Sequence, residues 1–271
     1  MSGDSLGDRM KENYENVFRQ NLIRRMPVII RVDGRAFHSV TKNCDKPFDG
    51  KIIDAMVYAA KQVAEDMQGF KIGYVQSDEA TFVLTDYETF DTQGWFDYNL
   101  SKMISISASV MTFHFNERWA WLNSFDNKRP GVIINKPLPI AYFDSRAFNI
   151  PREEVSNALL WRAKDWERNS IGMYARAFFS HKELLNKSCV DMHEMLHKIG
   201  KNWTTDLSDR EKNGTFLVRT EAGVEERTDV IPKFEEINKI VDPLINMEKL
   251  PEPKMTEGVD SITMFRHLAS R

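Results

Sequence analysis

The sequence has few cysteines and no long hydrophobic run. Its 271 residues include only two cysteines, Cys44 and Cys189, and their spacing fits neither a metal-binding nor a redox motif. A disulfide-stabilised fold is therefore not expected. The protein is expected in a reducing compartment such as the cytoplasm. No apolar run approaches the ~18 residues that a membrane-spanning helix needs. The polar N-terminal residues 1–15 are unlike a secretory signal.

An excess of positive charge is also absent. The 37 basic and 40 acidic side chains give a net charge of −3, which excludes a protein that binds nucleic acid through overall charge. Any RNA contact would need a local basic face or a groove between subunits. Hydrophobic residues make up 42% of the chain, enough for one large domain or a core with an appendage.

The spacing of apolar residues predicts the elements of the first half. A helix capped by Asp4 or Ser5 is expected up to residue 22. Strands are expected over 28–32, 72–75, 81–84 and 140–143, and further helices over 51–68 and 97–113. The order strand, helix, strand, strand, helix, strand is the ferredoxin-like α+β pattern. It predicts a four-stranded antiparallel sheet with two helices on one face.

The second half is predicted to be mainly helical between residues 151 and 199. A small β-hairpin over 215–219 and 224–230 would turn at Gly223. Residues 247–258, rich in Pro, Glu and Lys, are typical of a linker. The predicted organisation is a ferredoxin-like α+β core at 1–148, a helical region with the hairpin at 149–246 that packs on the core, and a linker and tail at 247–271.

Three carboxylates could carry chemistry. In the predicted sheet the first strand lies beside the third, so Asp33 approaches the turn that holds Asp78 and Glu79. Mg²⁺ prefers such oxygen ligands, and two ions can activate an attacking oxygen and stabilise a leaving pyrophosphate. Gly34 would let the backbone come close to an ion or phosphate. Each motif alone is also typical of an ordinary turn.

The loop that follows the first strand could hold a phosphate. Its backbone N–H groups could bind phosphate oxygens, Arg35 could add a guanidinium contact, and Phe37 could pack under a base. The alternative is an ordinary loop with a buried Phe37.

These motifs resemble those of the tRNA-His guanylyltransferase family, which includes 3′-to-5′ polymerases acting on tRNA. The similarity is carried by Val-Asp-Gly-Arg-Ala-Phe-His at 32–38, Gln-Ser-Asp-Glu at 76–79 and Tyr-Phe-Asp-Ser-Arg at 142–146, and it extends over about residues 5–230. The family has a polymerase-like palm, and its members are typically tetramers.

The resemblance implies roles for individual residues. Asp33, the Gly34 carbonyl and Asp78 would bind metal, with Glu79 assisting catalysis. The nucleoside triphosphate would be held by residues from two loops and one helix: Asp33, Gly34, Arg35, Ala36, Phe37, His38, Ser77, Asp78 and Lys102. ATP would activate a tRNA 5′-monophosphate, and the 3′-hydroxyl of GTP or another nucleotide would then attack it.

One departure from the family pattern bears on the substrate. Eukaryotic members carry His-Ile-Asn-Asn where this chain has Arg-Asn-Ser-Ile at 168–171. The sequence therefore resembles the guanylyltransferase-like branch, which favours template-dependent repair of 5′-truncated tRNA. Non-templated addition to tRNA-His is the alternative.

A basic stretch between residues 162 and 187 is the expected tRNA contact. The candidate residues are Arg162, Lys164, Arg168, Asn169, Arg176 and Lys182. Trp161, Trp166 and Trp203 could stack on exposed bases, or they could be core side chains.

Three other functions compete with this interpretation. His193-Glu194-Met195-Leu196-His197 matches the zinc-protease motif, although charged neighbours and the lack of a third ligand argue against it. A palm-type nucleotidyl cyclase would use the same carboxylates without RNA. A tRNA-binding module without catalysis would not need them.

Overall fold

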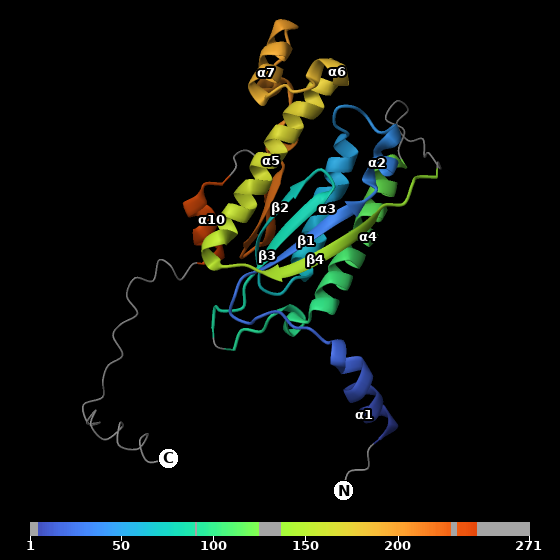
Figure 1. Ribbon diagram of the computed structural model, residues 1–271, viewed down its shortest axis with the longest axis vertical. Helices are drawn as coiled ribbons and strands as arrows, with labels where there is room; N and C mark the ends of the chain where they lie inside the picture. Colours follow the sequence, from blue (N-terminus) through green and yellow to red (C-terminus); the bar gives the residue numbers. More distant parts are fainter. Residues whose placement is uncertain (1–4, 90, 125–136, 229–231, 243–271) are drawn as a thin grey trace, which may run out of the picture.

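The computed structural model describes residues 5–89, 91–124, 137–228 and 232–242, which are built around one antiparallel sheet (Figure 1). Its six strands lie in the order β4-β1-β3-β2-β5-β6. They are β1 (Val28–Arg35), β2 (Phe70–Gln76), β3 (Glu79–Leu84), β4 (Tyr142–Asn149), β5 (Thr215–Thr220) and β6 (Gly223–Arg227). The first strand lies beside the third, as the ferredoxin-like pattern predicts.

The sheet is wider than the four strands expected for the core. Strand β5 pairs with β2, with Gly73 opposite Leu217, and β6 continues the sheet. A β2 edge without this partner would leave a row of unpaired backbone N–H and C=O groups. The predicted hairpin is therefore part of the same sheet, while the boundary between residues 148 and 149 stays a prediction.

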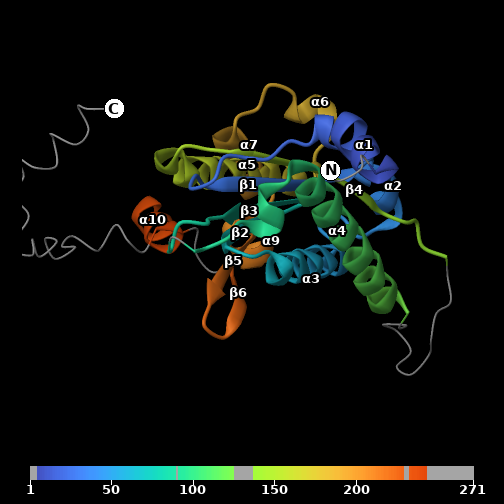
Figure 2. The ribbon, with the colours of Figure 1, turned by 90° about the horizontal axis from the view of Figure 1, so that it is seen from below.

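Helices cover both faces of the sheet (Figure 2). On one face lie α3 (Gly50–Asp66) and α4 (Leu100–Asn123), which bury Ile30 and Val32; on the other, α5 (Val155–Arg176) packs against Ile29. Because strand side chains alternate between faces, burial of both faces explains the unbroken apolar run that begins β1. The expected pair of helices on one face corresponds to α3 and α4, and α5 from the second half covers the other face.

The remaining helical segments are short. They are α1 (Leu6–Met10), η1 (Lys11–Glu15), η2 (Asn16–Phe18), α2 (Phe37–Val40), η3 (Thr41–Asn43), η4 (Trp95–Tyr98), η5 (Arg152–Glu154), α6 (His181–Leu184), α7 (Cys189–Lys198), α8 (Trp203–Asp206), α9 (Asp209–Asn213) and α10 (Phe234–Val241). Within the ranges described, no helix is long and apolar enough to cross a membrane.

The N-terminal segment departs from expectation. Ser5 caps it, since its side chain accepts a hydrogen bond from the Asp8 N–H at 3.0 Å, but the helical segment ends at Phe18 rather than near residue 22. None of its residues from Leu6 to Phe18 is buried, and it extends away from the sheet (Figure 1). The expected linker at 247–258 and the end of the hairpin at 229–230 lie outside the described residues.

Candidate active site

The end of β1 meets the turn between β2 and β3. Asp33 is paired in register with Glu79, and the next residue, Gly34, donates its N–H to the Asp78 carbonyl oxygen at 2.9 Å. Ser77, with a positive φ of 48°, turns the chain between the two strands. The predicted approach of Asp33 to this turn is therefore confirmed.

The carboxylates of Asp33 and Asp78 interact electrostatically. Burial raises the pKa of Asp78; a hydrogen bond from the Ser77 hydroxyl at 2.9 Å lowers it, and the nearby charge of Asp33 raises it, with a net upward shift. Asp33 has Arg146 4.0 Å away, whereas Asp78 has no ion-pair partner among the described residues. Two close carboxylates with incomplete charge compensation are a donor set that fits Mg²⁺.

Gly34 permits this close arrangement. A Cβ atom at this position would lie 2.6 Å from the Phe37 ring and 2.9 Å from the Asp78 Cβ. The glycine is thus required by packing, because both distances are far shorter than an ordinary carbon–carbon contact.

Glu79 does not join the pair. Its carboxylate points to the α5 side of the sheet and accepts two hydrogen bonds from Arg162, at 2.7 and 2.8 Å. Among the residues with described positions, no group of three His, Cys, Asp or Glu side chains is arranged to hold a metal. The three expected carboxylates are therefore a close pair, Asp33 and Asp78, with Glu79 ion-paired beside them.

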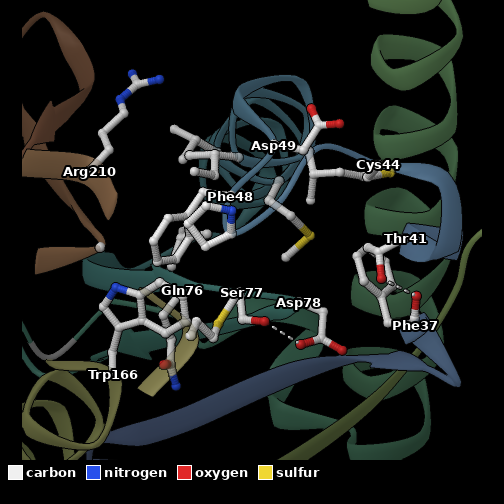
Figure 3. A pocket seen from close by; sticks show the side chains of 18 of the residues that line it. Phe37, Thr41, Cys44, Phe48, Asp49, Gln76, Ser77, Asp78, Trp166 and Arg210 are labelled. Carbon is white, nitrogen blue, oxygen red and sulfur yellow. Dashed lines mark hydrogen bonds between the residues drawn. The ribbon is translucent and has the colours of Figure 1, made fainter. Parts of the chain in front are cut away.

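An apolar cavity of about 180 Å³ opens next to Ser77 and Asp78 (Figure 3). It lies between α2, the start of α3, and the side chain of Trp166. Apolar and sulfur-containing side chains form most of its wall, and polar groups stand at its edge; the wall includes Cys44, Phe48, Ile52, Met56 and Val57, and the polar groups include His38, Asp49 and Arg210.

The loop after β1 leads into this cavity. Ala36 adopts a left-handed conformation that turns the chain into α2. Phe37 then lies in the core, with its ring centroid 5.4 Å from that of Phe115, and only its edge borders the cavity. The alternative of a buried phenylalanine is thus correct for Phe37, while Arg35 and His38 are exposed.

A larger groove of about 640 Å³ starts at the same carboxylates. One wall holds Asp33, Asp78 and Glu79, and the wall formed by α5 holds four of the six predicted tRNA-binding residues, namely Arg162, Arg168, Asn169 and Arg176. Lys164 borders a separate shallow groove beside Trp161, and Lys182 is exposed on α6. His181 also lines the large groove, although nothing in its sequence spacing marks it.

Some predicted residues lie elsewhere. Lys102 is exposed in the first turn of α4, which begins at the end of the sheet opposite α2 (Figure 1). Trp166 and Trp203 are buried, so the prediction that they stack on bases is wrong and the core alternative holds. Trp161 remains exposed, at 59%.

The zinc-protease motif does not form a metal site. The His193 ring packs edge-on against Trp203, with centroids 5.7 Å apart, and His197 is exposed near the end of α7. The absence of any three-ligand cluster in the described part of the chain removes the structural basis for zinc binding there.

Comparisons with known proteins agree with this arrangement. The family model described as tRNAHis guanylyltransferase matches residues 7–151. A probable tRNA(His) guanylyltransferase of Drosophila melanogaster is 27% identical over 248 residues, which cover 83% of this chain and 79% of that protein.

Solved structures extend the similarity over most of the chain. A bacterial tRNA(His) guanylyltransferase (Thg1)-like protein in complex with ATP is 37% identical, with a TM-score of 0.78, and the match covers 88% of this chain and 100% of that one. A bacterial Thg1-like protein in complex with GTP is 34% identical, with a TM-score of 0.70 and coverages of 89% and 99%. The chain therefore belongs to the tRNA(His) guanylyltransferase family, a family of nucleotidyltransferases that act on tRNA.

Proposed function

We propose that the protein adds nucleotides in the 3′-to-5′ direction to the 5′ end of tRNA, and that it requires magnesium. One observation carries this proposal: Asp78 lines both the apolar cavity and the groove with basic residues of α5, and Asp33 lines the groove beside it. A nucleotide in the cavity and an RNA end in the groove would then share these carboxylates.

The donor set supports a metal site at this junction. Asp33, Asp78 and the Gly34 carbonyl would hold Mg²⁺, with two ions expected, and the metal would neutralise charge on the reacting phosphates. Burial, and with it the nearby charge of Asp33, raises the pKa of Asp78, as expected of a carboxylate that lacks a compensating cation.

The apolar cavity is suited to a nucleobase. Its wall is mainly apolar, and His38, Ser77 and Asp78 border it, where they could meet the phosphates of a bound nucleotide. Asp49 and Arg210 at its edge offer hydrogen-bonding groups to a base. Lys102 lies away from this site, and its contact with the triphosphate stays a prediction.

The reaction would have two transfers. The tRNA 5′-phosphate attacks the α-phosphate of ATP and releases pyrophosphate; the 3′-hydroxyl of GTP or another nucleotide then attacks the activated 5′ end and releases AMP. The chain's own residues bind and align these groups, which is the larger part of catalysis in phosphoryl transfer.

The test is incubation with a 5′-truncated tRNA transcript, ATP, GTP and Mg²⁺. The wild type is expected to extend the RNA at its 5′ end, and Asp78→Ala to bind RNA without extending it. Asp97→Asn is the matched control: Asp97 is an exposed carboxylate outside the Asp33–Asp78 site, and the variant should extend RNA normally. Substantial turnover by Asp78→Ala would show that the site is assigned wrongly.

Template-dependent repair is the proposed form of the reaction. It is supported by the identity to the bacterial Thg1-like structures, 37% and 34%, against 23% for the structure of the Saccharomyces cerevisiae tRNA(His) guanylyltransferase in the same comparison. Non-templated addition of guanylate to tRNA-His is the alternative. Changing the nucleotide opposite the extended position distinguishes them, because only templated addition follows it.

The rival activities give different results in the same assay. A cyclase would consume the triphosphate without RNA, and a tRNA-binding module would bind without extension.

We further propose a cytoplasmic homotetramer; the exposed Leu6, Tyr14 and Phe18 of the N-terminal segment support contacts between copies. The mass in solution, measured by light scattering, tests the tetramer.

A further inference from the structure

The carboxylate of Glu79 is held by a single side chain from the other half of the molecule. Arg162 of α5 donates from Nε to Oε1 at 2.7 Å and from Nη2 to Oε2 at 2.8 Å. Both side chains are largely buried, with exposures of 15% and 11%. A bidentate pair of this kind fixes the direction of the carboxylate as well as its charge.

This pair lies directly beside the proposed metal ligands. Glu79 is the register partner of Asp33, and side chains paired in this way stand on the same face of a sheet. Arg31 approaches Glu79 from β1, with Nε 3.9 Å from Oε2, and that nitrogen is buried without a hydrogen-bond partner in the described structure. Apart from a long hydrogen bond from the Thr81 hydroxyl at 3.5 Å, the hydrogen bonds to Glu79 described in the structure come from Arg162.

The third nitrogen of Arg162 is also engaged. Nη1 lies 3.4 Å from Asp165, one helical turn along α5, and Asp165 in turn accepts hydrogen bonds from Arg168 and Asn169. Every guanidinium nitrogen of Arg162 thus has a carboxylate partner. Nη1 and Nη2 each keep one further N–H, but a shift of the guanidinium toward an RNA phosphate would weaken its bonds to the buried Glu79, which is costly.

Arg168 differs in this respect. Its side chain is 67% exposed, and among the described residues it forms an ion pair with Asp165 at the surface of α5. An exposed guanidinium at the groove can meet a phosphate at little cost, so the two arginines of α5 are suited to different tasks.

On the basis of the function proposed above, we propose that Arg162 is a positioning residue rather than a tRNA contact. It holds Glu79 beside Asp33 in the orientation needed for nucleotidyl transfer. Asp165 anchors the guanidinium and connects the Glu79–Arg162 pair to the face of α5 that would contact RNA. Loss of Arg162 should therefore slow the transfer to bound RNA and leave RNA affinity unchanged.

The experiment compares RNA affinity with single-turnover rate. RNA binding is measured in EDTA with a 5′-truncated tRNA transcript, and transfer is measured in Mg²⁺ with saturating ATP and GTP. Arg162→Lys keeps the charge but loses the paired hydrogen bonds; we expect it to lower the rate by about 10- to 100-fold, as small misplacements of reacting groups do, with the RNA Kd within about twofold. Arg162→Gln should be slower still, also with an unchanged Kd.

Two further variants provide the comparison. Arg168→Gln should weaken RNA binding in EDTA and flatten its dependence on salt. Arg227→Lys alters an exposed arginine–glutamate pair, with Glu236 at 2.9 Å, on the hairpin outside the groove lining, and should change neither quantity.

The outcomes separate this inference from the proposed function. If the wild type does not extend RNA, the proposed function fails. If it does, and Arg162→Lys weakens RNA binding as Arg168→Gln does, or transfers at the wild-type rate, the positioning role is wrong. If the Arg162 variants do not fold, Asp165→Asn decides: a slower transfer at undiminished RNA affinity supports the role, and an unchanged rate overturns it.

Discussion

Gly34 and Asp78 are joined by a backbone hydrogen bond of 2.9 Å, which closes the end of β1 onto the β2–β3 turn. The absence of a side chain at Gly34 makes room for this bond, since a Cβ would lie 2.9 Å from the Asp78 Cβ. The two proposed metal-binding loops are thus held together by the main chain.

Gly34→Ala should therefore damage both the site and the fold. The added methyl group also meets the Phe37 ring at 2.6 Å, so β1 or the turn must shift. Overpacking of this kind typically costs about 1–3 kcal/mol, measurable by urea unfolding, and the shift should reduce RNA extension as well.

Gly50→Ala is the matched control. A Cβ on this first residue of α3 would meet nothing within 4 Å, and alanine is a better helix former than glycine. It should be neutral or slightly stabilising. A Gly34→Ala variant as stable and active as Gly50→Ala would contradict the packing argument.

The raised pKa of Asp78 predicts a pH-dependent stability in EDTA. Burial is the main cause, and the charge of Asp33 adds to it. Because the folded protein binds the Asp78 proton more tightly than the unfolded chain, stability falls as pH rises from the ordinary pKa of an aspartate through the raised value. Asp78→Asn should remove this loss, so that the variant has a higher Tm than the wild type at pH 7.

Magnesium should reverse that difference. Binding to the folded state raises the Tm of the wild type, and the variant, which lacks one ligand, should respond less. The measurement is thermal unfolding of both proteins at pH 7, in EDTA and in Mg²⁺. An equal response of the two proteins would place magnesium elsewhere.

Cys44, in the wall of the apolar cavity, should report on nucleotide binding. Burial, followed by the charge of Asp49, raises the pKa of its thiol to about 11. In a Cys189→Ser background, alkylation by iodoacetamide should be slow at pH 7 and rise about tenfold per pH unit, because the thiolate is the reacting species.

ATP or GTP in the cavity should slow this alkylation further. Mass spectrometry of the Cys44 peptide measures the rate with and without nucleotide. A rate that is unaffected by saturating nucleotide would argue that the base does not occupy this cavity.

Trp161 should contribute to RNA binding. Its ring is 59% exposed on α5, with the Arg162 guanidinium 5.0 Å from its centroid and with Lys164 on the same shallow groove. Stacking of a base on an exposed aromatic ring is worth about 1–3 kcal/mol, so Trp161→Ala should weaken RNA binding by roughly 5- to 150-fold.

Trp121 of α4 offers a matched comparison. It is 52% exposed and also has an arginine, Arg118, over its ring at 4.5 Å, but it lies on the helix that covers the other face of the sheet. Trp121→Ala should not weaken RNA binding. Equal losses in the two variants would show that general aromatic exposure, rather than the α5 face, binds RNA.

The sequence was sufficient to predict the core topology and the position of Asp33. The alternation of strand and helix patterns implies that β1 lies beside β3, and that order brings Asp33 to the Asp78 turn without any alignment. The pairing of β5 with β2 was not predictable in this way, because a hairpin pattern says nothing about which edge it joins.

The direction of individual side chains was also beyond the sequence. Asp78 and Glu79 are neighbours in the chain, yet one stands in the turn beside Asp33 and the other meets α5. Glu79 begins β3 and meets Arg162, 83 residues further along, through a contact between two halves of the fold that local patterns do not encode. For the same reason the burial of Trp166 and Trp203 could not be foreseen.

The ion pair between Glu79 and Arg162 has a consequence for synthesis of the protein. A nascent chain that has emerged only as far as β4 already contains Asp33 and Asp78, but the helix that neutralises Glu79 has not yet left the ribosome. Until α5 arrives, Glu79 lacks its paired hydrogen bonds, and the groove lacks the wall that holds Arg162, Arg168 and Arg176. The nascent chain is thus expected to bind tRNA only after α5 has been synthesised.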